Sequence, residues 1–461
     1  MSDATATLRA RGEDYAGEHV PHPLISSAAG PMTGTCTVPG DKSISHRALM
    51  FGALAVGETR IGGLLEGEDV AATAAALRAL GATIERAEDG DWRVHGVGVG
   101  GLAEPDEPLD LGNSGTAVRL LAGICASHGF TTFMTGDASL RRRPMGRIIE
   151  PLERMGAHFE ARSGGRLPFA LIGADQPLPI EYRLPVASAQ VKSAVLFAGL
   201  NAPGETRVIE PAPSRDHTER MLRRFGAQVG VEAHADGGSV IAVTGYPELQ
   251  PCVLTVPGDP SAAAFPMAAA LMVPGSDVVI RQVGVNPGRI GLFETLREMG
   301  AKIEMGPRRE LGGEPLADIA VRAGPLRGVE VPATRAPSMI DEYPILSVIA
   351  ACAEGTTRLS GLAELRVKES DRLGATAAGL RAAGVTVTER EDGLDIVGCG
   401  GPPPGGGLVA THLDHRIAMA FLTLGMASEK PMTVDDGSMI GTSYPGFVAD
   451  MNRLGASIVE Q

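Results

Sequence analysis

A short pattern occurs six times along this chain, and the repetition restricts its fold more than any other sequence feature. In each copy a helix-forming run, such as ALRAL, ends in glycine and is followed by a strand-like run. Glycine just past a helix is the usual left-handed C-terminal cap. The glycines of the six copies, which follow one another at intervals of roughly 75 residues, are Gly81, Gly156, Gly226, Gly300, Gly384 and Gly455.

A second helical segment precedes each copy, and it is apolar almost all round, which indicates a helix buried on every side. Strand-like runs such as ETRIGGL and TTFMTG follow these segments, so the unit reads βαβαββ. Aromatic residues make up only 4% of the chain, whereas glycines number 61, which favours closely packed helices over an aromatic-rich sandwich. We therefore expect an α/β fold built from six such units.

The pentapeptide TVPGD occurs twice, and it divides the six units into two sets of three. The last unit is incomplete, so we expect residues 34–39 to supply its missing strand. The predicted domains are an inserted one, 40–257, and a discontinuous one, 1–39 plus 258–461. The crossings are expected near 38–41 and 256–259, and two domains joined in this way are expected to close on a ligand. An open solenoid is the alternative, but the buried helices are too apolar to line an exposed face.

The stretch around the first pentapeptide combines a helix start with cations. Lys42 and Arg47 lie in the first turns of a helix for which Ser43 or Ser45 is the expected N-cap. Free N–H groups and the helix dipole make cations unfavourable there unless an anion is bound. The alternative is a helix start whose basic side chains extend into solvent and bind no anion. The second pentapeptide continues as Pro260-Ser261-Ala262 without cations, so only the first copy is expected to form an anion-binding site.

Charge and composition exclude several classes of protein. The formal net charge of −14 argues against nucleic acid or an anionic membrane as the main partner. No apolar run of about 18 residues predicts a transmembrane helix. The five cysteines show no metal or redox spacing, and we expect buried thiols in a reducing cytoplasm. The residues before Ala29 resemble neither a signal peptide nor an anchor, and we expect a loose tail there.

Polar residues gather at the starts of the buried helices. Equivalent positions of repeated units converge when the units are arranged around an axis, and several helix N-termini that face one cleft would together form a strong anion-binding site. Outside this register, Arg141, Arg142 and Arg143 belong to a loop whose basic side chains are more often solvated. Lys368 and Arg372 stand four apart, a helical spacing at which like charges repel unless an anion bridges them, with a salt-bridge mesh to Glu369 and Asp371 as the alternative. The starts are Gly112–Thr116, Ala187–Lys192, Met339–Glu342 and His412–Arg416.

Two carboxylates, Asp341 and Glu369, are acid–base candidates because they accompany these cations. His412 and His415 are spaced like metal ligands, but no third ligand lies near them in sequence. We therefore expect chemistry without a metal or a cofactor.

Eight motifs in series resemble those of the EPSP synthase family of enolpyruvyl transferases. They are GDKSISHR, GNSGT, RPM, ASAQVKSA, RDHTE, SMIDEYP, RVKESDR and LDHRIAM. The resemblance implies two inverse α/β barrel-like domains, each of three βαβαββ repeats. It also implies a cytoplasmic monomer that transfers enolpyruvyl from phosphoenolpyruvate to the 5-hydroxyl of shikimate 3-phosphate, through a tetrahedral intermediate that loses phosphate.

The same resemblance implies a role for each matching residue. Asp341, Glu369 and Lys42 are the implied catalytic residues. The implied contacts of shikimate 3-phosphate are Lys42, Ser43, Arg47, Ser188, Ala189, Gln190, Ser214, Arg215, Asp341 and Lys368. The implied contacts of phosphoenolpyruvate are Lys42, Asn113, Gly115, Arg143, Gln190, Arg372 and Arg416. The inhibitor glyphosate is expected to compete in the second group, where Gly115 leaves room for it.

Two rival interpretations remain at the level of the sequence. The related transferase that acts on UDP-N-acetylglucosamine carries a characteristic cysteine in the loop that here reads GDASLRRRPM, and this loop has none. An inactive anion-binding protein on the same scaffold is the other rival, and the retained carboxylates and cations argue against it. The chain departs from some relatives at Thr442-Ser443-Tyr444, where a lysine often precedes the aromatic residue.

Overall fold

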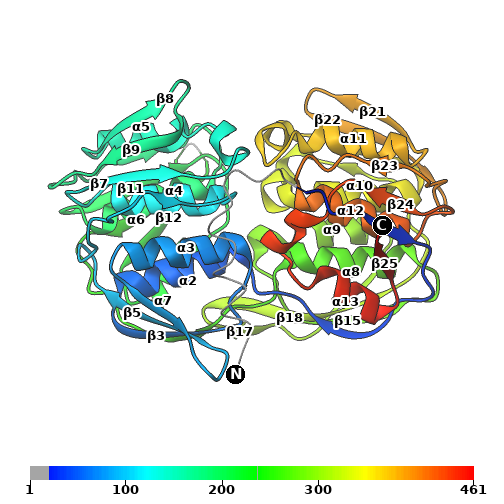
Figure 1. Ribbon diagram of the computed structural model, residues 1–461, viewed down its shortest axis with the longest axis horizontal. Coiled ribbons are helices and arrows are strands. Elements are labelled where there is room, and N and C mark those ends of the chain that lie inside the picture. Colours follow the sequence, from blue (N-terminus) through cyan, green and yellow to red (C-terminus); the bar gives the residue numbers. More distant parts are fainter. Residues whose placement is uncertain (1–19, 236) are drawn as a thin grey trace.

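The computed structural model describes residues 20–235 and 237–461. These residues form two halves that lie side by side, one drawn in blue to green and the other in green to red together with the dark blue N-terminal strands (Figure 1). Each half has its own hydrophobic core. One core draws on residues between Ile44 and Val256, and the other combines Leu24 to Val38 with Ala262 to Ile458. None of the helices in the described part is long and apolar enough to cross a bilayer.

The first half contains three four-stranded sheets in the described residues. Its strands are β3 (Val56–Gly62), β4 (Thr83–Arg86), β5 (Trp92–Val97), β6 (Leu109–Asp110), β7 (Thr131–Thr135), β8 (His158–Arg162), β9 (Arg166–Ile172), β10 (Glu181–Arg183), β11 (Glu205–Glu210), β12 (Val229–Ala233), β13 (Ser239–Thr244) and β14 (Val253–Thr255). Its helices are α2 (Lys42–Leu54), α3 (Glu68–Ala79), α4 (Gly115–Cys125), the 3₁₀ turn η1 (Leu140–Arg142), α5 (Gly146–Arg154), α6 (Ala189–Leu200) and α7 (His217–Arg224). The strand orders are β14-β3-β5-β4, β6-β7-β9-β8 and β10-β11-β13-β12.

The second half repeats this plan. Its strands are β1 (Leu24–Ser27), β2 (Thr33–Thr37), β15 (Asp277–Gly284), β16 (Lys302–Met305), β17 (Arg309–Leu311), β18 (Glu314–Arg322), β19 (Glu330–Val331), β20 (Glu354–Leu359), β21 (Thr386–Arg390), β22 (Gly393–Cys399), β23 (Leu408–Val409), β24 (Met432–Val434) and β25 (Ser457–Glu460). Its helices are α8 (Pro260–Met272), α9 (Gly291–Glu298), α10 (Tyr343–Cys352), α11 (Arg372–Ala382), α12 (His415–Gly425) and α13 (Phe447–Leu454), with 3₁₀ turns η2 (Pro287–Arg289), η3 (Ala333–Ser338), η4 (Ile340–Glu342), η5 (Ala363–Val367) and η6 (Ser438–Thr442). The strand orders are β16-β18-β15-β2, β19-β20-β22-β21 and β23-β24-β1-β25, and β17 pairs with β18.

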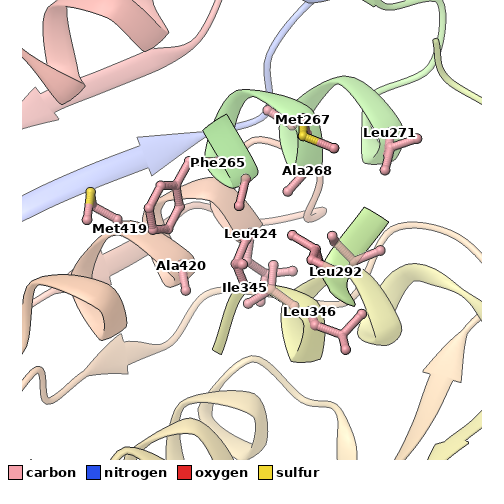
Figure 2. Close-up of a cluster of buried hydrophobic side chains, with 14 of the residues drawn as sticks. Phe265, Met267, Ala268, Leu271, Leu292, Ile345, Leu346, Met419, Ala420 and Leu424 are labelled. Carbon is pink, nitrogen blue, oxygen red and sulfur yellow. The ribbon is translucent and has the colours of Figure 1, made fainter. Parts of the chain in front are cut away.

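The predicted βαβαββ unit is confirmed. Each predicted glycine follows the second helix of its unit and has a positive φ, from 76° at Gly384 to 118° at Gly455. Only glycine adopts this left-handed conformation without a steric cost. The first helix of each unit is buried between its sheet and its neighbours. Figure 2 shows Phe265 of α8, Ile345 of α10 and Met419 of α12 meeting in one apolar cluster.

The chain crosses between the halves at the two pentapeptides, and the strands there are exchanged. β2 precedes α2 in sequence but pairs in parallel with β15 of the second half, whereas β14 precedes α8 but pairs with β3 of the first. The crossings bond to each other, because the Asp41 N–H donates to the Pro257 carbonyl and the Asp259 N–H to the Pro39 carbonyl, both at 2.8 Å. The domain boundaries given above stay a prediction.

Three expectations about the first 45 residues are wrong. Residues 24–27 are not a loose tail, because β1 pairs with β24 on one side and β25 on the other. It is this strand, not residues 34–39, that completes the sixth sheet, since Thr33–Thr37 belongs to the fourth unit. The rest of the predicted tail, residues 1–19, lies outside the described residues. The N-cap of α2 is also not a serine, because the Asp41 carboxylate accepts from the Ile44 N–H at 3.0 Å.

Candidate active site

The predicted site residues lie mostly at the N-terminal ends of the buried helices, and side chains cap these ends locally. Ser114 caps α4, Ser188 caps α6 and Asp414 caps α12, each through a side-chain oxygen that accepts a backbone N–H. Predicted contacts therefore begin each helix: Gly115 and Ala189 are first residues, and Arg416 is second in its helix. The caps satisfy part of each helix end, and the remaining N–H groups and the dipole favour an anion nearby.

The Asp341 carboxylate lies at the centre of a cationic cluster that draws on both halves. Arg215, from the first half, donates from Nη2 to Asp341 Oδ2 at 2.8 Å. Arg372 donates from Nη1 to Asp341 Oδ1 at 3.2 Å, and Lys368 Nζ lies 3.7 Å from the same oxygen. Arg416 donates to the Asp341 backbone carbonyl at 3.1 Å. Residues that are as much as 201 positions apart, at 215 and 416, therefore converge on one acidic residue.

Glu369 lies in a second cluster, which shares Arg372 with the first. Its carboxylate pairs with Arg372 at 2.5 Å and approaches Arg143 of the first half to 3.9 Å. The Ser139 hydroxyl donates to the Glu369 carbonyl at 3.0 Å, which is another direct bond between the halves. Arg372 is 1% exposed and is shared between the two carboxylates and Asp414, to which its Nε donates at 2.8 Å.

The cations decide the protonation of both carboxylates. Burial alone would raise the pKa of Asp341, but Lys368, then Arg215, Arg416 and Arg372, hold the pKa of that carboxyl well below its usual range. Burial likewise opposes ionisation of Glu369, and Arg372 followed by Arg143 keeps the pKa of its carboxyl well below the usual value. Both groups are therefore carboxylates in this state and can accept a proton.

Arg47 is held by neighbours from three segments. Its Nε donates to Thr218 Oγ1 and its Nη2 to Ser193 Oγ, both at 2.7 Å, and its Nη1 donates to the Ser43 carbonyl. Ser214 donates to Glu210 at 2.7 Å, next to the ion pairs that Lys192 makes with Glu210 and Glu219. Of the two predicted phosphate ligands, the Arg47 side chain is thus fixed by buried polar partners in the first half, and Ser43 is joined to it through its backbone carbonyl.

Arg119 is a site residue that the sequence interpretation missed. Its Nη1 donates to Gln190 Oε1 at 2.8 Å, and the same atom would lie 3.0 Å from a Cβ added at Gly115. Burial, and next the neighbouring Arg143, lowers the pKa of the Arg119 guanidinium to about 10. The signal was present, because Arg119 follows Gly115 by four residues, just as Arg47 follows Ser43.

Other predicted residues are placed as follows. Asn113 accepts from Arg143 through its side-chain oxygen at 2.5 Å, and Lys42 pairs with Asp69 at 2.9 Å.

The basic loop at Arg141–Arg143 is only partly solvated, because Arg141 and Arg142 are exposed whereas Arg143 is buried. The four-residue spacing predicted that Lys368 and Arg372 share a helix, and this prediction is wrong. Lys368 follows η5 and Arg372 begins α11, and an internal anion, Asp341, lies between them.

A cavity of about 520 Å³ opens beside these clusters. It is lined from the first half by Ser139, Arg142 and Arg143, and from the second by residues 366–371 and His412. Of the clustered charges described above, Arg143, Lys368 and Glu369 border this space, which is large enough for a small organic anion. Asp341 is not among its lining residues, and is joined to it through Lys368, whose Nζ lies 3.7 Å from Asp341 Oδ1.

Two halves of three βαβαββ units, with a cationic cleft between them, define the enolpyruvyl transferase class of fold. The enolpyruvyl transferase NikO from Streptomyces tendae shares this fold with a TM-score of 0.75, over 96% of this chain and 99% of that one, at 19% identity. Within this class the chain belongs to the EPSP synthase family. The family description, EPSP synthase (3-phosphoshikimate 1-carboxyvinyltransferase), matches residues 27–451.

Similar proteins support the same family. The 3-phosphoshikimate 1-carboxyvinyltransferase of Parvibaculum lavamentivorans is 63% identical over 96% of this chain and 98% of its own length. That of Granulibacter bethesdensis is 63% identical over 91% and 92%. The solved EPSP synthase of Acinetobacter baumannii is 45% identical, with a TM-score of 0.84 over 95% of this chain and all of that one.

Proposed function

We propose that this chain transfers the enolpyruvyl group of phosphoenolpyruvate to the 5-hydroxyl of shikimate 3-phosphate and releases phosphate, as a step of chorismate biosynthesis. Membership of the EPSP synthase family carries the proposal. The cationic cleft supports it, because both substrates are multiply charged anions that need fixed, preorganised donors. We also infer that the protein is cytoplasmic and monomeric. Sedimentation of the purified chain would test whether it is a monomer.

In the proposed reaction the hydroxyl oxygen attacks C2 of phosphoenolpyruvate and Asp341 accepts the hydroxyl proton. C3 gains a proton from the carboxyl group of Glu369, which is protonated in the substrate complex, and this gives a tetrahedral intermediate. A proton then returns from C3 to the Glu369 carboxylate as the C2–O bond to phosphate breaks and phosphate leaves. Both are carboxylates here, and substrate anions that engage Lys368, Arg215 and Arg372 would raise their proton affinity.

The remaining residues would bind substrate. Lys42 would contact both substrates. Shikimate 3-phosphate would be held by the segments of Ser43, Arg47, Ser188–Gln190, Ser214–Arg215 and Lys368, and phosphoenolpyruvate by Asn113, Gly115, Arg143, Arg372 and Arg416. Phosphate release in the presence of both substrates tests the function directly. Release with UDP-N-acetylglucosamine as acceptor, or no release at all, would contradict it.

Shikimate 3-phosphate is expected to draw the two halves together. Its proposed ligands come from both halves, and the pairs Arg215–Asp341 and Arg147–Glu364, which join the halves in this structure, show that direct contact between them is possible. A ligand that binds the closed form more tightly shifts the population towards it. Solution scattering should show a smaller radius of gyration at saturating ligand. An unchanged radius would contradict closure but not the assigned reaction.

Gly115→Ala is expected to weaken inhibition by glyphosate more than it weakens binding of phosphoenolpyruvate. A Cβ at this position would lie 2.9 Å from Arg143 Nη1 and 3.0 Å from Arg119 Nη1, so both flexible side chains must shift. Glyphosate is the longer ligand and has less room to adjust. The inhibition constant and the KM for phosphoenolpyruvate, measured in both forms, check this. Equal proportional changes would show that position 115 does not discriminate.

A further inference from the structure

Arg289 joins the two crossings between the halves. It ends the turn η2 and its side chain is 2% exposed. Its Nη1 donates to Asp41 Oδ2 at 3.1 Å, and its Nη2 donates to Asp259 Oδ1 at 2.9 Å. Asp41 and Asp259 are the N-caps of α2 and α8. One buried guanidinium therefore binds the caps of the first helix on each side of the crossings.

This arrangement reaches the backbone of Lys42. Asp259 uses its other oxygen, Oδ2, to accept from the Lys42 N–H at 3.2 Å. The second half of the molecule thus holds the first residue of α2, which belongs to the other half, through a carboxylate that Arg289 orients. A guanidinium presents its donors in a rigid fork and can serve two carboxylates at once, whereas an ammonium is a single point of charge.

The same turn contacts a second segment of the candidate site. Asn286, immediately before η2, donates from Nδ2 to Asp216 Oδ1 at 2.7 Å. A Cβ added at Gly288 would lie 3.5 Å from the Cα of Arg215, so the turn packs directly against that residue. Arg215 in turn pairs with Asp341. Residues 286–289 therefore support two site segments of the first half from within the second half.

We propose that Arg289 is a positioning residue that holds Lys42 in register with Asp341 when the two halves are closed. The inference rests on the proposed function, since it assigns Lys42 to both substrates. Arg289 itself bonds the two cap carboxylates and is not among the residues that line the cavity described above. Its effect on turnover is therefore indirect and must act on both substrates together.

Arg289→Lys in the full chain tests this, with Arg297→Lys on the exposed side of α9 as the matched control. We expect Arg289→Lys to lower kcat/KM for both substrates by at least about tenfold, with kcat itself reduced, because a displacement of about 1 Å can cost up to about 100-fold. Arg297→Lys should stay within twofold of the parent. Thermal unfolding, measured in parallel, gives the folded fraction at the assay temperature.

A purely structural role would lower the unfolding midpoint but leave kcat and KM per folded molecule unchanged, and this result would overturn the proposal. If Arg289→Lys does not fold, Asp259→Asn replaces it, since asparagine keeps a cap oxygen but loses the charge that faces Arg289 and the Lys42 N–H. The same loss for both substrates is expected, and parental kinetics would overturn the proposal. Failure of the proposed function would be seen separately, as absence of transfer by the parent.

Discussion

Replacing Asp341 with asparagine is expected to lower kcat by about 10²- to 10⁴-fold, the usual contribution of a general base. An amide is nearly isosteric with the carboxylate but cannot accept the hydroxyl proton. The KM values should change only a few-fold, because removal of a negative charge beside Lys368, Arg215 and Arg372 does not weaken a site for anions. Steady-state kinetics with each substrate varied in turn provides the measurement.

Asp106→Asn is the matched control, since Asp106 lies on an exposed segment of the first half. It should leave turnover and both KM values at the parental level. Turnover of Asp341→Asn within threefold of the parent would remove Asp341 from its role as base. A large rise in KM with unchanged kcat would assign it to substrate binding instead.

Arg372→Gln is expected to affect both stability and catalysis. The buried guanidinium pairs with Asp414, Glu369 and Asp341, and its removal leaves three carboxylates without that partner. Breaking a buried ion pair from one side costs about 3–5 kcal/mol of unfolding free energy. A lost charged contact to substrate costs about 2–5 kcal/mol, which corresponds to a fall in kcat/KM for phosphoenolpyruvate of roughly 30- to 4,000-fold.

Chemical denaturation and steady-state kinetics separate the two effects. Arg381→Gln is the matched control, because Arg381 lies on the exposed side of the same helix, where its half-exposed side chain is 3.6 Å from Glu389. It should change the unfolding free energy by no more than about 1 kcal/mol. Parental affinity of folded Arg372→Gln for phosphoenolpyruvate would show that Arg372 orders the carboxylates without binding substrate.

Features that depend on neighbouring residues were predictable from the sequence. The six glycines were found because a left-handed cap needs glycine wherever the helix lies in space. The buried helices were found because a helix that is apolar all round has few alternatives. Local reasoning failed where competing residues were close, as at the N-cap of α2. There Ser43, Ser45 and Asp41 are all chemically suitable, and the position of the crossing selects Asp41.

The sequence by itself therefore determined the repeated unit, the number of copies and the membership of the family through its motifs. Only the tertiary structure decided which strands are exchanged at the crossings, that β1 completes the last sheet, and that Arg119 and Arg289 belong beside the site. The physical reason is the range of the interactions. Caps and helical periodicity act over a few residues, whereas strand pairing and buried ion pairs join segments up to hundreds of residues apart, and their partners are chosen by the packing of the whole chain.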